Sequence, residues 1–239
     1  MKNVIITGAS SGIGQALAHA LDNGAYRLVL SGRNKERLQT LTDSLSCEHL
    51  VHIGDVREYD DCQELVNSCL NEFGGVDVLI NNAGLGHFDP LHQGKIEEWH
   101  RMVDVNVKGV LNCLHSAMPS LIEQRGHVIN IGSIASHHVF PNSGVYCATK
   151  HALFGISESI RVELNGRVKV TTISPGAVDT DFINKTTNEE IHGNMKDYFA
   201  SAMRPKSIAV QIKHAIESPE DSVVNEIIVR PFRSHRRPA

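Results

Sequence analysis

Ser133, Tyr146 and Lys150 are the residues of this 239-residue chain whose types and spacing point most directly to chemistry. Tyr146 and Lys150 lie four residues apart in a segment with helical periodicity, so both side chains project from one helix face. Ser133 follows a short apolar run that ends at Ile131 and predicts a strand. Because open α/β sheets bind ligands at the carboxyl ends of their strands, we expect a hydroxyl, a phenol and an ammonium group to meet there.

These three groups suit proton transfer to or from a substrate oxygen. An ordinary tyrosine has a pKa of about 10 and is a poor base at neutral pH. A neighbouring lysine cation favours the phenolate, so we expect Lys150 to lower the pKa of Tyr146. The Ser133 hydroxyl can hydrogen-bond the reacting carbonyl or alcohol. A Tyr–Lys pair at this spacing also fits a helix without function, and the rest of the chain decides between the two interpretations.

Composition and charge exclude several classes of protein. The length fits one α/β domain, and a net charge of −4 gives no reason to expect nucleic acid as a partner. No apolar run is long enough for a signal peptide or a membrane span. The five cysteines include no C-x-x-C pair, and Cys62 and Cys69 share an apolar helix face. We therefore expect a reducing, cytoplasmic location and no metal site, with the basic tail at 233–239 solvated.

The chain alternates predicted strands with helical segments and shows no linker or repeat. Strands are expected at 4–6, 27–30, 49–53, 76–80, 127–131, 168–173 and 226–229. Helices are expected after the first strand, at 35–45 and 59–73, from 95 and through 107–124, around Tyr146 up to 164, and at 208–217. This pattern predicts one Rossmann-type, doubly wound parallel sheet of about seven strands in a single domain, residues 1–239. The polar stretch 179–203 would form a lid over the substrate.

A glycine-rich turn, Thr7–Gly14, joins the first strand to the first helix. Such a turn lets the backbone approach a phosphate, and the helix N-terminus supplies N–H donors for it. Its spacing is G-x-x-x-G-x-G, and a plain tight turn is the alternative. Arg33 follows the second strand where an acidic residue would bind a ribose hydroxyl, which favours NADP over NAD. A solvated Arg33 at the start of a helix is the alternative.

Three further positions carry weaker signals. Asp55 at the end of the third strand suits either adenine contact or helix capping. Asn81–Gly84 places two amides and two small residues at a strand end, where a flat ligand could lie, although an ordinary loop has the same composition. Asn106 falls between two helical segments and predicts a kink or a water anchor. Pro119 predicts a bend or restart late in the second of them.

Taken together, the chain resembles the short-chain dehydrogenase/reductase family over essentially its whole length. The resemblance rests on Thr7–Gly14 as T-G-x-x-x-G-x-G, Asn81–Gly84 as N-N-A-G, Asn106, Ser133 and its interval of thirteen residues to Tyr146, the Y-x-x-x-K of Tyr146 and Lys150, and Pro175-Gly176. Within the family the ending 224–231 is similar to that of bacterial NADP-dependent 3-hydroxy acid (serine or allo-threonine) dehydrogenases.

The resemblance implies a role for each matching residue. Tyr146 would be the general acid or base, Lys150 would hold the nicotinamide ribose, Ser133 would orient the substrate carbonyl, and Asn106 would hold a water that links Lys150 to solvent. The cofactor-binding residues it implies, besides Tyr146 and Lys150, are Gly8, Ser10, Ser11, Gly12, Ile13, Gly14, Arg33, Asp55, Val56, Asn82, Ala83, Gly84, Pro175, Gly176, Val178 and Thr180. Ser10 and Ser11 are neutral where many NADP-using relatives carry a basic residue, so NADP preference depends on Arg33.

The favoured hypothesis is an NADP-dependent oxidoreductase that interconverts a secondary alcohol and a carbonyl on a small polar substrate. One alternative is a cofactor-binding regulatory protein with the same fold and no useful turnover. Another is an acyl-carrier ketoreductase, which would need a basic docking surface that the mixed charges of 179–203 do not clearly provide. The resemblance also implies a homodimer or homotetramer assembled through the helices before and after Ser133.

Overall fold

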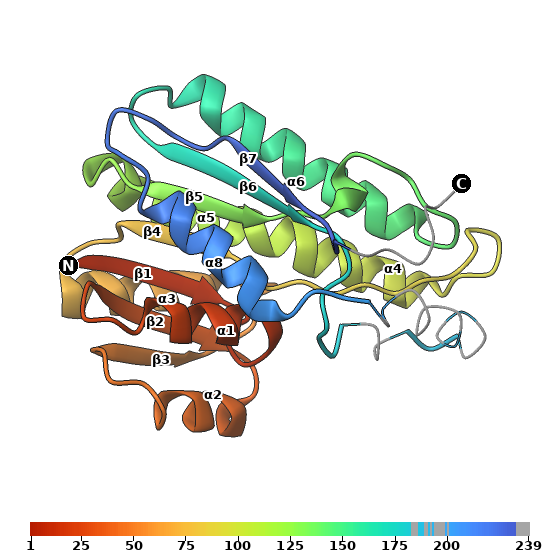
Figure 1. Ribbon diagram of the computed structural model, residues 1–239, viewed down its shortest axis with the longest axis horizontal. Helices are drawn as coiled ribbons and strands as arrows, with labels where there is room; N and C mark the ends of the chain where they lie inside the picture. Colours follow the sequence, from red (N-terminus) through yellow and green to blue (C-terminus); the bar gives the residue numbers. More distant parts are fainter. Residues whose placement is uncertain (183–185, 189–190, 192, 194–198, 200, 233–239) are drawn as a thin grey trace.

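The strands form one parallel sheet of seven strands in the order β3-β2-β1-β4-β5-β6-β7 (Figure 1). Their bounds are β1 Lys2–Thr7, β2 Tyr26–Gly32, β3 His49–Ile53, β4 Val78–Asn81, β5 His127–Ile131, β6 Lys169–Pro175 and β7 Glu226–Val229. This computed structural model describes residues 1–182, 186–188, 191, 193, 199 and 201–232. The basic tail 233–239 and part of the expected lid 179–203 lie outside the described residues. The predicted fold class, a Rossmann-type α/β sheet of about seven strands, is confirmed.

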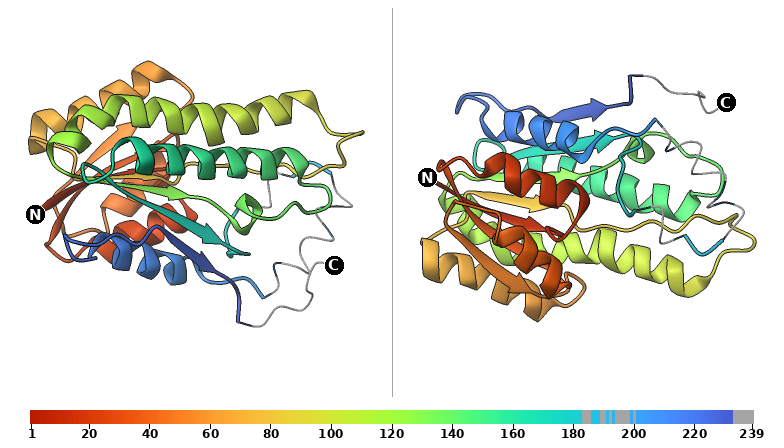
Figure 2. Two further views of the ribbon diagram at one scale, coloured as in Figure 1. Left: turned by 90° about the horizontal axis from the view of Figure 1, so that it is seen from above. Right: turned by 60° about the horizontal axis from the view of Figure 1, so that its bottom comes forward.

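Helices cover both faces of the sheet. Their bounds are α1 Gly12–Leu21, α2 Lys35–Thr42, α3 Tyr59–Phe73, α4 Ile96–Val103, α5 Gly109–Glu123, α6 Gly144–Glu163 and α8 Pro205–Ile216. A π-helical turn, Asp104–Lys108, joins α4 to α5, and a 3₁₀ turn, Ile134–Ser136, follows β5. Figure 2 shows α5 and α6 side by side on one face, with α1 and α8 on the other.

Alternation along the strands produces two buried cores. Val4 and Ile6 of β1 belong to the core beneath α1, α2 and α8, whereas Ile5 belongs to the core beneath α3, α5 and α6. All three are fully buried, as expected for a central parallel strand covered on both faces. Each such side chain contributes roughly 1.5–3 kcal/mol through burial. The two cores therefore hold the carboxyl ends of the strands in fixed positions.

Local sequence explains where several helices begin and end. The Asn34 side chain accepts a hydrogen bond from Arg37 N and caps α2. Gly74 ends α3 in the left-handed conformation at a φ of 81°. Pro205 occupies the first turn of α8, where its missing N–H has no cost. Among the described residues, no helix is both long enough and apolar enough to span a membrane.

Some predicted boundaries differ from the structure. The two segments expected around Asn106 form one continuous helical run through a π-helical turn. The bend or restart expected at Pro119 does not end the helix, because α5 continues to Glu123 with Pro119 on its exposed side. The fourth strand begins at Val78 and not at 76, since Val76 N donates to Ser120 Oγ (2.9 Å) instead of entering the ladder.

Candidate active site

Helix α6 holds Tyr146 and Lys150 in its first two turns, at the carboxyl edge of the sheet. Both side chains are buried, with 9% of Tyr146 and 6% of Lys150 exposed. Lys150 Nζ donates to Ile131 O at 2.7 Å and lies 5.9 Å from the centre of the Tyr146 ring. The end of β5 therefore fixes the ammonium group beside the phenol, as the spacing predicted.

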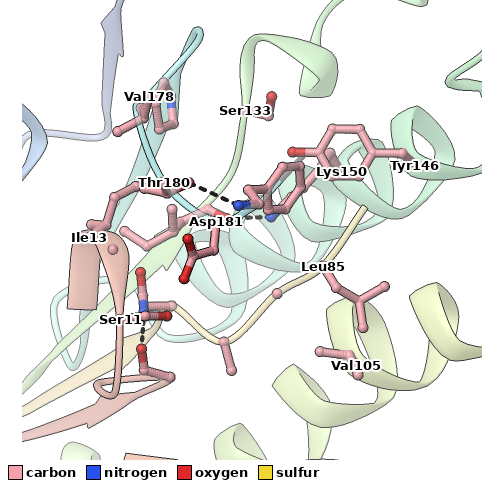
Figure 3. Close-up of a pocket in the computed structure, with 18 of the residues that line it drawn as sticks. Ser11, Ile13, Leu85, Val105, Ser133, Tyr146, Lys150, Val178, Thr180 and Asp181 are labelled. Carbon is pink, nitrogen blue, oxygen red and sulfur yellow. Dashed lines mark hydrogen bonds between the residues drawn. The ribbon is translucent and has the colours of Figure 1, made fainter. Parts of the chain in front are cut away.

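Ser133 is held by the 3₁₀ turn that follows β5. Its Oγ accepts a hydrogen bond from Ala135 N (3.1 Å), and its own N–H donates to Ser136 Oγ (3.2 Å). This reciprocal capping fixes the Ser133 side chain while leaving its hydroxyl proton available for another acceptor. Figure 3 shows Ser133, Tyr146 and Lys150 along one side of the pocket, with Ser11 and Ile13 of the glycine-rich turn across from them.

Burial, rather than the lysine charge, dominates the acid–base properties of this pair. It raises the pKa of Tyr146 to about 12, although the hydrogen bond with Ser133 acts in the opposite direction. Burial also lowers the pKa of Lys150 to about 8. The expectation that Lys150 lowers the pKa of Tyr146 is therefore not met in this geometry, because the burial of the phenol itself has the largest effect. The phenol is fully protonated at neutral pH and can act as a proton donor.

Asn106 makes a different set of contacts from the water bridge that the resemblance implies. Within the π-helical turn, its Oδ1 accepts from Leu85 N and its Nδ2 donates to Leu85 O, both at 2.9 Å. Nδ2 also donates to Thr149 Oγ1 (3.0 Å) on α6. Asn106 thus holds the loop after β4 against α6. Its link to Lys150 through water stays a prediction.

The glycine-rich turn is shaped for close approach by a ligand and is supported from β4. Gly8 and Gly12 adopt φ values of 64° and 57°, in the region that favours glycine. Asn82 Nδ2 donates to Thr7 O (2.9 Å) and Gly8 O (3.1 Å), so this residue of the N-N-A-G motif supports the turn directly. A Cβ on Gly14 would lie 2.5 Å from Gly8 O, which explains the third glycine as a packing requirement.

The start of α1 fits a phosphate group. Ser11 occupies the N-cap position without making a side-chain capping bond, so the N–H groups of the first helical turn are free for an anion. Thr180 approaches from the segment after β6, since its Cγ2 would lie 3.0 Å from a Cβ on Gly12. The residues present therefore form a cradle that suits the pyrophosphate of a dinucleotide.

Two arginines lie beside Asp55, at the end of the pocket away from Tyr146. Arg57 binds Asp55 Oδ2 through Nε (3.0 Å) and Nη2 (2.7 Å), whereas Arg33 reaches the same oxygen only at 3.5 Å. Burial raises the pKa of Asp55, but hydrogen bonds and charge from Arg57 outweigh it and hold the pKa below its usual value. Because Arg57 satisfies Asp55, Arg33 remains available for a phosphate.

Sequence reasoning missed Arg37, which lines the pocket four residues after Arg33. It pairs with Asp181 Oδ2 at 3.1 Å and so connects α2 to the segment after β6. Arg37 lies in the first turn of α2, just after Arg33 and the N-cap Asn34, so a second basic residue at the start of this helix was the available signal. The aromatic residues Phe88 and Phe182 also line the pocket. They lie in loops, where the spacing of residues in the sequence does not predict which side chains meet.

One continuous cavity of about 1000 Å³ connects the two ends. This is at the upper end of the roughly 300–1,000 Å³ usual for ligand sites, so it has room for a cofactor and a substrate together. Ser133, Tyr146, Lys150 and every expected cofactor residue except Gly14 line it: Gly8, Ser10, Ser11, Gly12, Ile13, Arg33, Asp55, Val56, Asn82, Ala83, Gly84, Pro175, Gly176, Val178 and Thr180. Gly14 lies behind the turn, and Asn106 lies behind Gly84 and Leu85.

A parallel sheet with a glycine-rich turn, a phosphate cradle and a deep cavity at its carboxyl edge defines the Rossmann-type dinucleotide-binding class. The family model for short chain dehydrogenases matches residues 2–191. The chain therefore belongs to the short-chain dehydrogenase/reductase family, and it is an oxidoreductase of that family.

Relatives and solved structures agree with this assignment. An uncharacterised oxidoreductase of Staphylococcus saprophyticus is 39% identical over 235 residues, which cover 96% of both chains. An alcohol dehydrogenase from the archaeon Thermococcus sibiricus, solved with 5-hydroxy-NADP, has a TM-score of 0.88 at 33% identity and covers 100% of this chain and 99% of its own. The closed form of a serine dehydrogenase with NADP+ has a TM-score of 0.88 at 31% identity, with coverages of 95% and 93%. The structural likeness includes the serine dehydrogenases predicted from the chain ending. A short chain dehydrogenase/reductase from Burkholderia phymatum, solved with NAD, has a TM-score of 0.88 at 25% identity, with coverages of 95% and 88%.

Proposed function

We propose that this protein interconverts a secondary alcohol and a carbonyl with NADP(H), using Tyr146 as the general acid and base. The observation that carries the proposal is the position of Ser133, Tyr146 and Lys150 at one end of the cavity whose other end holds the glycine-rich turn and Arg33. The same cavity thus has a place for the cofactor and a proton donor for the substrate.

In the proposed reaction, Ser133 donates its hydroxyl proton to the substrate oxygen, in place of its bond with Tyr146, and orients that oxygen toward Tyr146. Tyr146, protonated because burial raises its pKa to about 12, supplies the proton that the reduced oxygen requires. Lys150 keeps donors in addition to its bond to Ile131 O, and these would hold the nicotinamide ribose. When bound, NADPH supplies the hydride, while the protein provides orientation and the proton.

NADP is favoured over NAD by the arginines at the adenosine end. Arg33 and Arg37 both line the cavity beside the end of β2. Two guanidinium groups suit a 2′-phosphate, because arginine matches phosphate geometry with paired N–H donors. The expected lid, 179–203, is part of this proposal. Its described residues Thr180, Asp181 and Phe182 line the cavity, and a bridge between Val178 and Met203 joins the two ends of the segment.

The test is NADPH oxidation by the purified protein with a panel of ketones, followed by absorbance. Tyr146→Phe should lower kcat by roughly 10²- to 10⁴-fold, the usual contribution of a general acid, while calorimetry shows NADPH binding retained. A protein that binds NADPH and turns over no ketone or alcohol would instead be the cofactor-binding regulatory protein. A Tyr146→Phe variant with full activity would remove Tyr146 from the mechanism.

A further inference from the structure

We propose that the substrate is an uncharged ketone or secondary alcohol with an apolar substituent of about the size of an aromatic ring, and not a hydroxy acid. This inference rests on the proposed function and adds the substrate class to it. It is carried by the side chains that surround the Tyr146 end of the cavity.

Two phenylalanines face the Tyr146 ring. The Phe88 ring lies 5.4 Å from it at an interplanar angle of 60°, and the Phe182 ring lies 5.6 Å away at 63°. The two phenylalanines are 6.2 Å apart. All three contacts are edge-to-face, the arrangement that aromatic rings prefer. A fourth aromatic ring, brought in by the substrate beside Tyr146, would therefore meet ring edges and faces on more than one side.

Phe182 approaches closely because the opposite residue has no side chain. A Cβ on Gly86 would lie only 2.7 Å from Phe182 Cζ. Gly86 lies in the loop after β4 and Phe182 in the segment after β6, so the glycine lets the two loops close over the apolar space. The Phe88 side chain is buried beneath this contact, with 7% of the residue exposed.

The remaining lining at this end is mostly apolar, with Asn142 and Ser143 as polar members before α6. Its apolar members are Leu85, Val105, Ile134, Ala135, Phe140 and Ile191. Most of these residues pack with Phe88 and Tyr146 in one hydrophobic cluster. An apolar substituent placed here would gain roughly 25 cal/mol for each Å² of surface removed from water, whereas a polar substituent would lose its hydration.

Charge gives the second argument. Within the part of the chain that the structure describes, the basic side chains lining the cavity are Arg33, Arg37 and Lys150. Arg33 and Arg37 lie at the adenosine end and face Asp55 and Asp181. Lys150 donates to Ile131 O, and its remaining donors are those proposed to hold the nicotinamide ribose. These described residues leave no cation to pair with a substrate carboxylate, and an unpaired charge is costly to bury. This differs from the hydroxy-acid substrates that the likeness to serine dehydrogenases suggests.

Matched substrate pairs test the inference. Methyl acetoacetate and acetoacetate present the same keto carbon and differ in charge, while 4-phenyl-2-butanone and 2-butanone differ in the aromatic ring. With NADPH, we expect kcat/KM to be at least about tenfold higher for the ester and for the phenyl ketone, since apolar pockets discriminate by about 10- to 200-fold per group. Acetoacetate used as well as its ester, or 2-butanone used as well as its phenyl analogue, would overturn the inference.

The two proposals fail in different ways. If acetoacetate is preferred and the activity disappears in Tyr146→Phe, the substrate class is wrong while the proposed function holds. If the protein binds NADPH and reduces none of the four ketones, the substrate-class proposal is wrong, and the wider panel of ketones and alcohols decides the proposed function. Tyr146→Phe measured with each preferred substrate separates these outcomes.

A variant locates the apolar contact. Phe182→Ala should reduce the ratio of kcat/KM for 4-phenyl-2-butanone to that for 2-butanone by roughly tenfold, because the ring that faces Tyr146 is lost. Phe232→Ala is the matched control: this phenylalanine is 99% exposed, so the ratio should not change. Gly86→Ala, which displaces Phe182 without removing it, should change the ratio in the same direction. A wild-type ratio in both Phe182→Ala and Gly86→Ala would show that Phe182 does not contact the substrate.

Discussion

Lys150 combines a charge with nearly complete burial, and this makes it costly to the folded protein. Burial lowers its pKa from 10.5 to about 8. In the unfolded chain the side chain keeps its ordinary pKa. Between these two values the unfolded chain therefore binds a proton that the folded chain has released. The free energy of unfolding consequently rises as the pH increases from about 8 to 10.5, because the folded chain loses its buried charge first. This gain in stability is lost as the pH falls back through about 8, where Lys150 becomes charged in the folded chain as well.

We predict that Lys150→Met removes this pH dependence. The difference in unfolding free energy, wild type minus variant, should rise by up to about 3 kcal/mol as the pH increases from about 8 to about 10.5, because each pKa unit corresponds to about 1.4 kcal/mol. Urea unfolding of the cofactor-free proteins at several pH values measures it. A difference that stays constant with pH would contradict the burial of a titrating ammonium group.

Arg33 is the residue on which cofactor choice depends. Arg33→Ala should lower the ratio of kcat/KM for NADPH to that for NADH by roughly 10- to 100-fold, the equivalent of one charged hydrogen bond of about 1.5–3 kcal/mol. Steady-state kinetics with both cofactors measure the ratio. Arg27→Ala is a suitable control, because Arg27 lies at the other end of β2 and pairs with Glu48 at 2.9 Å. An NADH preference in the wild type would refute the assignment of Arg33 to a phosphate.

At the scale of elements, the glycine-rich turn and β4 act as one unit. Asn82 bonds the carbonyls of Thr7 and Gly8, and Gly14 lies against the same atoms. The shape of the phosphate cradle therefore depends on a contact between the first and fourth strands of the chain, which are neighbours in the sheet.

Gly14→Ala should weaken NADPH binding by at least about tenfold, since its methyl group would lie within 2.6 Å of Gly8 O and Asn82 Nδ2 and would displace the turn. Calorimetric titration with NADPH measures this effect. Gly155→Ala provides a matched helical control, because a Cβ there meets no described atom within 4 Å outside its own helix backbone and chain neighbours. Equal affinities for the two variants would mean that the position of the turn does not govern binding.

The order and type of the elements followed from the sequence because strands buried on both faces and amphipathic helices have distinct patterns. The residues that line the cofactor part of the cavity also followed, since motifs at strand ends must meet at one sheet edge. Arg37, Phe88 and Phe182 did not, because their positions depend on how loops and the start of α2 fold over that edge. The pKa values of Tyr146 and Lys150 also could not be predicted, because burial is a tertiary property.

At the scale of the whole molecule, the outer faces of α5 and α6 are the surfaces through which the predicted homodimer or homotetramer would assemble. They lie side by side on one face of the sheet (Figure 2). Leu111 on α5 is 47% exposed and Val162 on α6 is 79% exposed in the single chain. Association through this face would remove both apolar side chains from water.

Leu111→Glu should therefore shift the protein toward monomers, as measured by size-exclusion chromatography with light scattering. The cause is the cost of burying an unpaired carboxylate in an interface. Val210→Glu introduces the same charge on α8, on the opposite side of the sheet, at a residue of similar exposure, and it should leave the assembly unchanged. A wild-type protein that is already monomeric would refute the predicted oligomer.

The ion pair between Arg37 and Asp181 has a kinetic consequence. It joins α2 to the segment after β6, and both residues line the cavity, so the pair must separate if these two segments move apart. Both side chains are more than half exposed, and such pairs contribute only about 0–1 kcal/mol and weaken with salt. Raising the ionic strength should therefore speed NADP+ release by a few-fold in stopped-flow experiments, and Asp181→Asn should reduce this acceleration to the part that comes from the arginines at the phosphate.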